Sequence, residues 1–116
     1  LNLYLRVDLK YLPEETAVTV MLAPPHDVKL RFQLEEGRAT LVVAAGVHDI
    51  ALIEACYAEV LEIKLPFATF DAEPGNRVRL RAELMVQGVE TEILPADGLL
   101  ALIVPDKSFE RTLWYA

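Results

Sequence analysis

The sequence predicts an all-β fold, an antiparallel two-sheet β-sandwich of about eight or nine short strands. In most segments apolar and polar residues alternate with a period of two, as a half-buried strand requires. Turns rich in Gly, Pro and acidic residues separate these segments at regular spacing, which is typical of sandwiches and barrels. The apolar residues are divided evenly among many strands, which favours two packed sheets. We therefore expect residues 1–116 to form a single module without repeats or linkers.

The first half of the chain is predicted to hold four strands. The alternation supports strands over residues 1–9, 17–22, 28–34 and 39–45. The second of these is apolar on both faces except for Thr19, which indicates a central strand covered on both sides. Pro24 and Pro25 interrupt the pattern and predict a loop, because proline cannot donate to a strand ladder. Gly37 permits the positive φ of a hairpin turn between the third and fourth strands.

Residues 47–60 carry two competing signals. Asp49 could cap a helix whose apolar residues recur at helical spacing, and the alanines and glutamates of this segment favour a helix. The end of the segment alternates like a strand. A short helical turn near residues 49–55, followed by a strand from about Tyr57, accommodates both signals.

The longest alternation runs from Arg77 to Val86 and predicts a strand whose outer face carries Arg77, Arg79, Arg81 and Glu83. Gln87 and Gly88 then form a tight turn into a strand over residues 89–93. A two-residue loop would pair Val86 with Val89, Leu84 with Thr91 and Ala82 with Ile93, and would set Glu83 against Glu92. Arg81 or Arg31 could relieve that acidic pair. Residues 99–104 and the end of the chain would supply two further strands.

Composition limits the classes of partner. Acidic residues outnumber basic ones by 18 to 11, which gives a net charge of -7 and argues against nucleic acid and anionic membranes as partners. The single cysteine, Cys56, permits no internal disulfide and is expected to be a buried apolar residue. No apolar run is long enough to span a bilayer, and no secretory signal is evident. Because the chain begins at Leu1 already in strand alternation, we expect a piece excised from a longer protein. Its expected location is the cytoplasm.

Three pieces of the sequence resemble the C-terminal β-sandwich region of family-57 glycoside hydrolases, of the amylase and amylopullulanase type. They are the opening Leu3-Tyr4-Leu5-Arg6-Val7-Asp8, the central Val60-Leu61-Glu62-Ile63-Lys64-Leu65-Pro66-Phe67 with Pro74-Gly75-Asn76-Arg77-Val78, and a tail with Glu92-Ile93-Leu94-Pro95, Ile103-Val104-Pro105-Asp106, Phe109-Glu110 and Trp114. The central strand, Pro-Phe corner and Gly turn are also similar to family-9 carbohydrate-binding modules and related electron-transfer sandwiches.

The resemblance implies a non-catalytic accessory module, with catalysis in a separate domain of the same chain. None of the family's catalytic residues can be assigned to positions in this sequence. The partner it implies is the catalytic domain, with α-glucan as a possible ligand, a role in carbohydrate metabolism and no cofactor. By itself the chain is therefore not expected to be an enzyme.

The residues themselves offer little for catalysis or metal binding. His26 and His48 have no second His or Cys at ligand spacing, so they are expected to be solvent-exposed loop residues and not zinc ligands. Glycoside hydrolysis needs two carboxylates facing each other across a cleft, whereas Glu62, Glu90 and Glu92 fall on outward strand faces. The loop from Asp71 to Asn76 could hold a structural Ca²⁺, although it lacks the twelve-residue calcium-loop pattern and a plain turn explains it.

A sugar-binding face would show exposed aromatic rings flanked by polar groups. Tyr4 is best placed for this role, on the polar face of the first strand with Arg6 and Asp8. The candidate carbohydrate-binding residues are Tyr4, Arg6, Asp8, Tyr11 and Trp114. The alternative interpretation is that the phenylalanines and Trp114 belong to the core and that the tyrosines are half-buried packing residues.

A second function from another class is a small-ligand or haem-binding sandwich of the electron-transfer type. That function needs axial Met or His ligands inside a pocket. Met21 and Met85, with His26 or His48, are the candidates, and nothing in their spacing brings them together.

Overall fold

The computed structural model describes residues 2–8, 15–35, 37–58, 60–87, 89–94, 100–103 and 111–115. Within these residues the chain forms ten strands and two short 3-10 helices. The strands are β1 (Asn2–Asp8), β2 (Thr16–Leu22), β3 (Val28–Glu35), β4 (Arg38–Ala45), β5 (Glu54–Tyr57), β6 (Val60–Pro66), β7 (Arg77–Val86), β8 (Val89–Leu94), β9 (Leu100–Ile103) and β10 (Arg111–Tyr115). The helices are η1 (Ile50–Leu52) and η2 (Phe67–Phe70).

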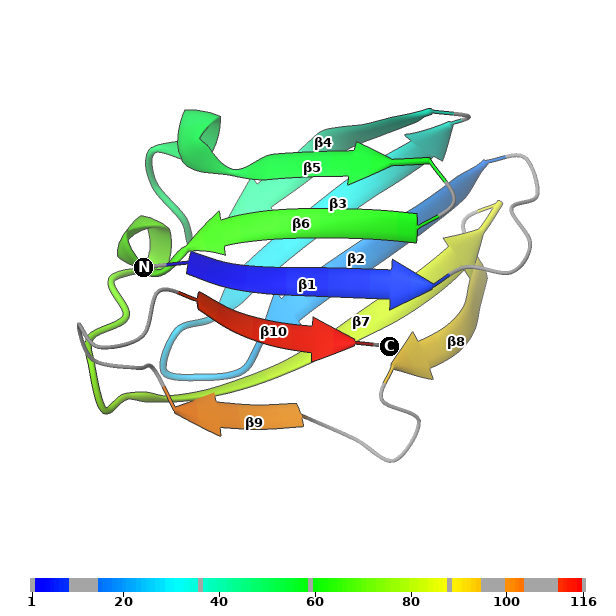
Figure 1. Cartoon of the computed structure of the whole chain (residues 1–116). Helices are drawn as coiled ribbons and strands as arrows, with labels where there is room; N and C mark the ends of the chain where they lie inside the picture. The colour runs from blue at the N-terminus through cyan, green and yellow to red at the C-terminus, as the bar shows by residue number, and fades with distance from the viewer. Residues whose placement is uncertain are drawn as a thin grey trace.

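The strands form two sheets packed face to face, so the predicted β-sandwich is confirmed (Figure 1). The four-stranded sheet has the order β10-β1-β6-β5. The six-stranded sheet has the order β4-β3-β2-β7-β8, and β9 pairs with the other end of β7. Strand pairing is antiparallel except between β1 and β10, which run parallel. None of the described helices is long and apolar enough to cross a membrane.

The core lies between the two sheets and is built from the inward residues of the alternating strands. In the four-stranded sheet Leu5 pairs with Ile63, and both are almost completely buried. In the six-stranded sheet Val20 lies between Leu30 and Ala82, and all three have no exposed surface. Burying a large apolar side chain contributes about 1.5–3 kcal/mol, so these facing layers supply most of the stabilisation of the fold.

The central strand β2 is buried on both faces, as the sequence predicted. Its outward residues Ala17 and Thr19 are 7% and 1% exposed. Thr19 pairs with Arg31 on one side and Glu83 on the other, and the Arg31 Nε donates a hydrogen bond of 3.1 Å to its Oγ1. Long side chains on β3 and β7 thus flank the small residues of β2 and shield them from water.

The predicted register of the last hairpin is partly wrong. Val86 pairs with Val89 as expected, but a β-bulge between Leu84 and Met85 shifts the remaining pairs. The observed pairs are Leu84 with Glu92, Glu83 with Ile93 and Ala82 with Leu94. The extra residue of the bulge removes the expected Glu83–Glu92 pair. Glu83 instead forms an ion pair of 3.0 Å with Arg81, two residues away on the same face.

The ambiguous segment contains a helical turn, as predicted, but its boundaries differ. The turn is the three-residue η1, and Asp49 precedes it without a capping hydrogen bond from its side chain. The strand starts at Glu54, not at about Tyr57, and the chain then turns back into β6 to form a hairpin. The carboxylate of Asp49 binds His48 instead of the helix terminus, which explains why it is not a cap.

Candidate functional site

The candidate carbohydrate-binding face is the outer face of the four-stranded sheet. Tyr4 is half-buried and Arg6 is exposed, and the alternation of β1 places both residues on this face. The register places Tyr4 between Lys64 of β6 and Leu113 of β10. Arg6 lies between Glu62 and Tyr115 in the next row. Tyr4 is therefore surrounded by charged neighbours on the β6 side.

The structure does not bring the five predicted residues together as one set. Asp8 ends β1 in register with Val60, and nothing further is described of its side chain. Tyr11 lies outside the described residues. The register places Trp114 beside Leu5, a core residue, and not beside Tyr4. Of the predicted residues, Tyr4 and Arg6 are the two that the structure shows on a common outer face.

Polar side chains of β5 and β6 also belong to this face, which was not predicted from the sequence. The Lys64 Nζ lies 3.1 Å from Glu54 Oε2, and the Cys56 Sγ lies 4.0 Å from Glu62 Oε2. Glu62 is exposed, as its position on the outward face predicted. Cys56 is exposed as well, so the expectation that it is buried is wrong. The alternation of β6 indicates that Glu62 and Lys64 point outward, and this was the signal in the sequence for a polar face. The alternation does not reveal that β6 pairs with β1 and β5.

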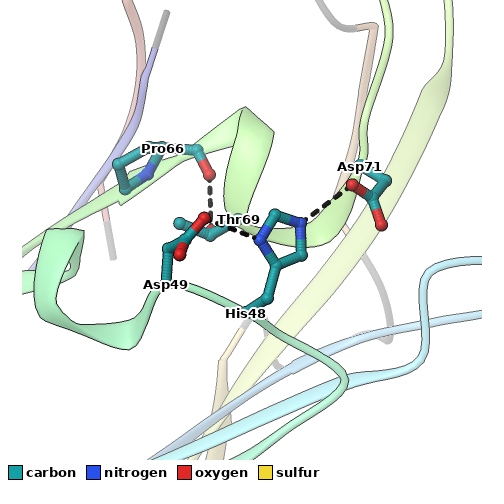
Figure 2. A network of polar contacts seen from close by, with 5 residues as sticks. All are labelled: His48, Asp49, Pro66, Thr69 and Asp71. Atoms are coloured by element: carbon teal, nitrogen blue, oxygen red, sulfur yellow. Dashed lines mark hydrogen bonds and ion pairs between the residues drawn. The ribbon is translucent and has the colours of Figure 1, made fainter.

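A second polar cluster joins the two connections that cross between the sheets (Figure 2). His48 lies between β4 and η1, and its ring is held between two aspartates. The Nδ1 atom lies 2.9 Å from Asp49 Oδ2, and the Nε2 atom lies 2.9 Å from Asp71 Oδ1. The backbone N–H of His48 donates to the carbonyl of Thr69 at 2.8 Å, and the Thr69 hydroxyl donates to the carbonyl of Pro66 at 2.6 Å.

The two aspartates stabilise the protonated form of His48. Hydrogen bonds to Asp71, and then to Asp49, raise the pKa of the imidazole above its usual 6.5. The side chain is 50% exposed, so water screens this interaction. The cluster is a surface clamp between the β4–η1 connection and the end of η2. The prediction that His48 is exposed in a loop is confirmed.

The geometry of the clamp is not that of a metal site. The two ring nitrogens point to different carboxylates on opposite sides of the imidazole, so the three groups cannot converge on one ion (Figure 2). In the described part of the chain, no group of three or more His, Cys, Asp or Glu side chains could hold a metal. In the loop considered for Ca²⁺, Asn76 Oδ1 already accepts the backbone N–H of Glu73 at 2.9 Å.

His26 is not the solvent-exposed residue that the sequence predicted. It is half-buried, and its ring meets the edge of Phe70 at a centroid distance of 5.4 Å. Its Nδ1 atom is buried and has no hydrogen-bond partner among the residues that the structure describes. The Pro-rich loop folds back over the end of η2, a long-range contact that loop composition does not reveal.

The candidate haem ligands are not assembled around a common pocket among the described residues. Met21 is half-buried and pairs with Lys29 and Arg81, which belong to the outer face of the six-stranded sheet. The Thr19 hydroxyl donates to the Met85 sulfur at 3.8 Å. His48 is engaged by its two aspartates.

Three large apolar side chains are exposed where the sandwich edge is formed by β4, η1 and β5. Val42, Ile50 and Leu52 each have 53% of their surface exposed. Val42 is the extra residue of a bulge in β4, since Arg31 pairs with Val43 and Phe32 with Leu41. We call these three residues the apolar edge. The sequence pattern of β4 had not separated Val42 from its half-buried neighbours Leu41 and Val43.

Comparison of the chain with protein-family models, with curated proteins and with solved structures finds no match.

Proposed function

We propose that this chain is a non-catalytic accessory module of a glycoside hydrolase of the family-57 type, and that it packs against the catalytic part of the same protein. The observation that supports this proposal is the apolar edge. Exposed apolar side chains that gather in one region of a surface mark sites of protein contact, whereas single ones scattered over it carry no meaning. Val42 lies on the edge strand β4, and Ile50 and Leu52 lie on η1, the element that follows β4 in the chain.

Side-chain packing fits this edge better than strand addition. In the described part of the chain, β4 and β5 are the outermost strands of their sheets, and each has one side without a paired strand. A free strand edge can recruit another strand, but a bulge twists the edge and interrupts the ladder. The bulge at Val42 has this effect on β4 and turns an additional apolar side chain outward. A partner would therefore cover these side chains without extending the sheet.

The apolar edge is tested by binding of the module to the separately expressed catalytic domain of the parent protein. Leu52→Asp places a charge at the edge and should weaken binding at least about tenfold, because it leaves a carboxylate unsatisfied in an apolar contact. Ala51→Asp is the matched control, because Ala51 is exposed in the same 3-10 helix and is not one of the three large apolar residues. Absence of binding, or equal weakening by both variants, would contradict the proposal.

Binding of α-glucan through the Tyr4 face is the secondary role that we propose. A tyrosine ring can stack on a pyranose ring, and the charged groups beside it can bind hydroxyls. The half-buried Tyr4, flanked by Lys64 and close to Arg6, supports this role. A single aromatic residue of this kind predicts weak binding.

Affinity electrophoresis in soluble starch or glycogen tests this role. The wild-type module should be retarded relative to a gel without polysaccharide, and Tyr4→Ala should migrate as if no polysaccharide were present. Thr40→Ala, an exposed position on the other sheet, should remain retarded. Equal mobility of the wild type in both gels would remove glucan binding from the proposal without affecting the docking role. A haem absorbance band in the purified protein would instead favour the electron-transfer function.

A further inference from the structure

The outer face of the six-stranded sheet carries a basic surface in an otherwise acidic chain. β3 and β7 together hold five of the 11 Lys and Arg residues, Lys29, Arg31, Arg77, Arg79 and Arg81, and only two acidic residues. The net charge of β3 and β7 together is +3, whereas the net charge of the whole chain is -7. The surplus of positive charge is therefore concentrated on two strands, and the rest of the chain is strongly acidic.

Lys29, Arg31 and Arg81 flank β2, and Arg79 and Arg77 continue the row of β7 beyond the end of β2. Figure 1 shows β2 between β3 and β7 in the rear sheet. Lys29 and Arg81 both pair with Met21, one from each side. Adjacent strands lie about 4.8 Å apart, so the two rows are separated by roughly 10 Å. Between the rows the outer face of β2 is formed by Ala17, Thr19 and Met21, which carry no charge.

A shallow depression lies at the end of this surface near the β2–β3 connection. It is lined by Met21, Leu22, Ala23, Asp27, Val28, Lys29 and Arg81. Lys29 is exposed, and within the described residues it forms no ion pair. Arg79 is exposed, and one of its terminal nitrogens donates to the carbonyl of Pro24 at 3.2 Å, which holds the guanidinium beside this loop.

Acidic residues of the described part of the chain also border this surface, and one of them, Glu35, lies at the far end of β3 in register with Arg38. Glu83 is paired with Arg81 at 3.0 Å and neutralises part of its charge. Asp27 contributes to the lining of the depression. Lys29 and Arg79, like Arg77, are exposed and form no ion pair within the described residues, so they can bind an external carboxylate.

We propose that this surface, centred on Met21 and bordered by Lys29, Arg31, Arg79 and Arg81, is a docking site for an extended acidic segment of a protein partner. Along a strand, alternate residues are about 6.6–6.8 Å apart. This is the spacing of Arg79 from Arg81 and of Lys29 from Arg31, so an extended peptide with acids at alternate positions matches either row. Met21, the half-buried residue between Lys29 and Arg81, receives the apolar parts of its side chains.

A short peptide fits these charges better than a membrane or a nucleic acid does. A bilayer or a duplex extends well beyond the basic surface and meets the acidic remainder of the chain, which repels it. A peptide of a few residues contacts the basic surface alone, and screening at physiological salt limits the other charges to a range of about 8 Å. The docking site shares no residue with the apolar edge and lies on the opposite sheet from Tyr4, so the proposal does not depend on the function proposed above.

The test measures binding of a fluorescein-labelled peptide of alternating glutamate and valine by fluorescence anisotropy. The wild-type module should bind it at low salt, and affinity should fall several-fold as salt rises to physiological strength. The Lys29→Gln, Arg79→Gln double variant should bind on the order of tenfold more weakly, since two exposed ion pairs are lost. A glutamine–valine peptide should not bind.

The matched control is the Lys64→Gln, Arg38→Gln double variant. It loses the same charge, but Lys64 lies on the other sheet and Arg38 lies at the far end of β4, paired with Glu35. This variant should bind the peptide as the wild type does. Equal weakening by the two double variants, or no binding by the wild type, would overturn the proposal. The proposal would also be overturned if the module bound phosphatidylserine vesicles and not the peptide. It would likewise be overturned if the module self-associated and the Lys29→Gln, Arg79→Gln double variant did not.

Discussion

A comparison of two isoleucines tests the position of the core. Ile63 is 1% exposed and pairs with Leu5 and Ala55, whereas Ile50 is 53% exposed in η1. Truncation of a buried isoleucine to alanine costs about 2–5 kcal/mol, because transfer energy is lost and a cavity remains. At Ile50 roughly half of the same surface is already hydrated, and alanine has the better helix propensity, so the cost should stay below about 1 kcal/mol.

Urea unfolding at equilibrium, followed by circular dichroism, measures both effects. Ile63→Ala should lower the free energy of unfolding by at least about 1.5 kcal/mol more than Ile50→Ala does. If Ile63→Ala does not fold, Ile63→Val gives a milder test, with an expected loss of about 0.5–1.5 kcal/mol. A loss at Ile63 equal to or smaller than the loss at Ile50 would refute the assignment of the core to the space between the sheets.

Two further predictions concern the connections between the sheets. Hydrogen bonds to its two aspartates raise the pKa of His48 in the folded protein. The clamp should therefore contribute its full stability below about pH 6.5, as long as the aspartates stay ionised. This contribution should be lost as the pH rises through the pKa of His48 in the folded protein. Urea unfolding from pH 5.5 to 8.5 should show this decrease in the wild type but not in His48→Gln, and parallel profiles would contradict it. Gly46→Ala should destabilise by at least about 1 kcal/mol more than Gly37→Ala in the same assay. Both glycines have positive φ, but a Cβ at Gly46 would overlap the carbonyl of Asp27, whereas a Cβ at Gly37 would meet open space. Equal losses in the free energy of unfolding would contradict this prediction, because they would show that the overlap is relieved.

Much of the fold follows from local patterns in the sequence. The alternation in β1, β3 and β7 identified their inward residues, because a strand that buries one face must place apolar residues at every second position. The apolar character of β2 on both faces correctly placed it in the centre of a sheet. These inferences need only the pleat of a strand and the cost of exposing apolar surface.

The bulges could not be inferred, because a single extra residue changes pairing without changing the composition of a strand. The bulge opposite Leu84 and Met85 removed the expected Glu83–Glu92 pair, and the one at Val42 exposed a valine that the pattern did not distinguish from its neighbours. Whether an extra residue bulges or shifts the whole register depends on the packing of the opposite sheet.

The sequence by itself determined which residues face inward along β1, β3 and β7 and that two sheets would enclose a core. Only the tertiary structure decided which strands are neighbours. It placed β6 beside β1, brought His48 between Asp49 and Asp71, and aligned the cations of β3 and β7 across β2. The physical reason is that alternation is a property of one strand, set by its own backbone geometry. Adjacency joins residues far apart in the chain and follows from how the whole core packs most closely.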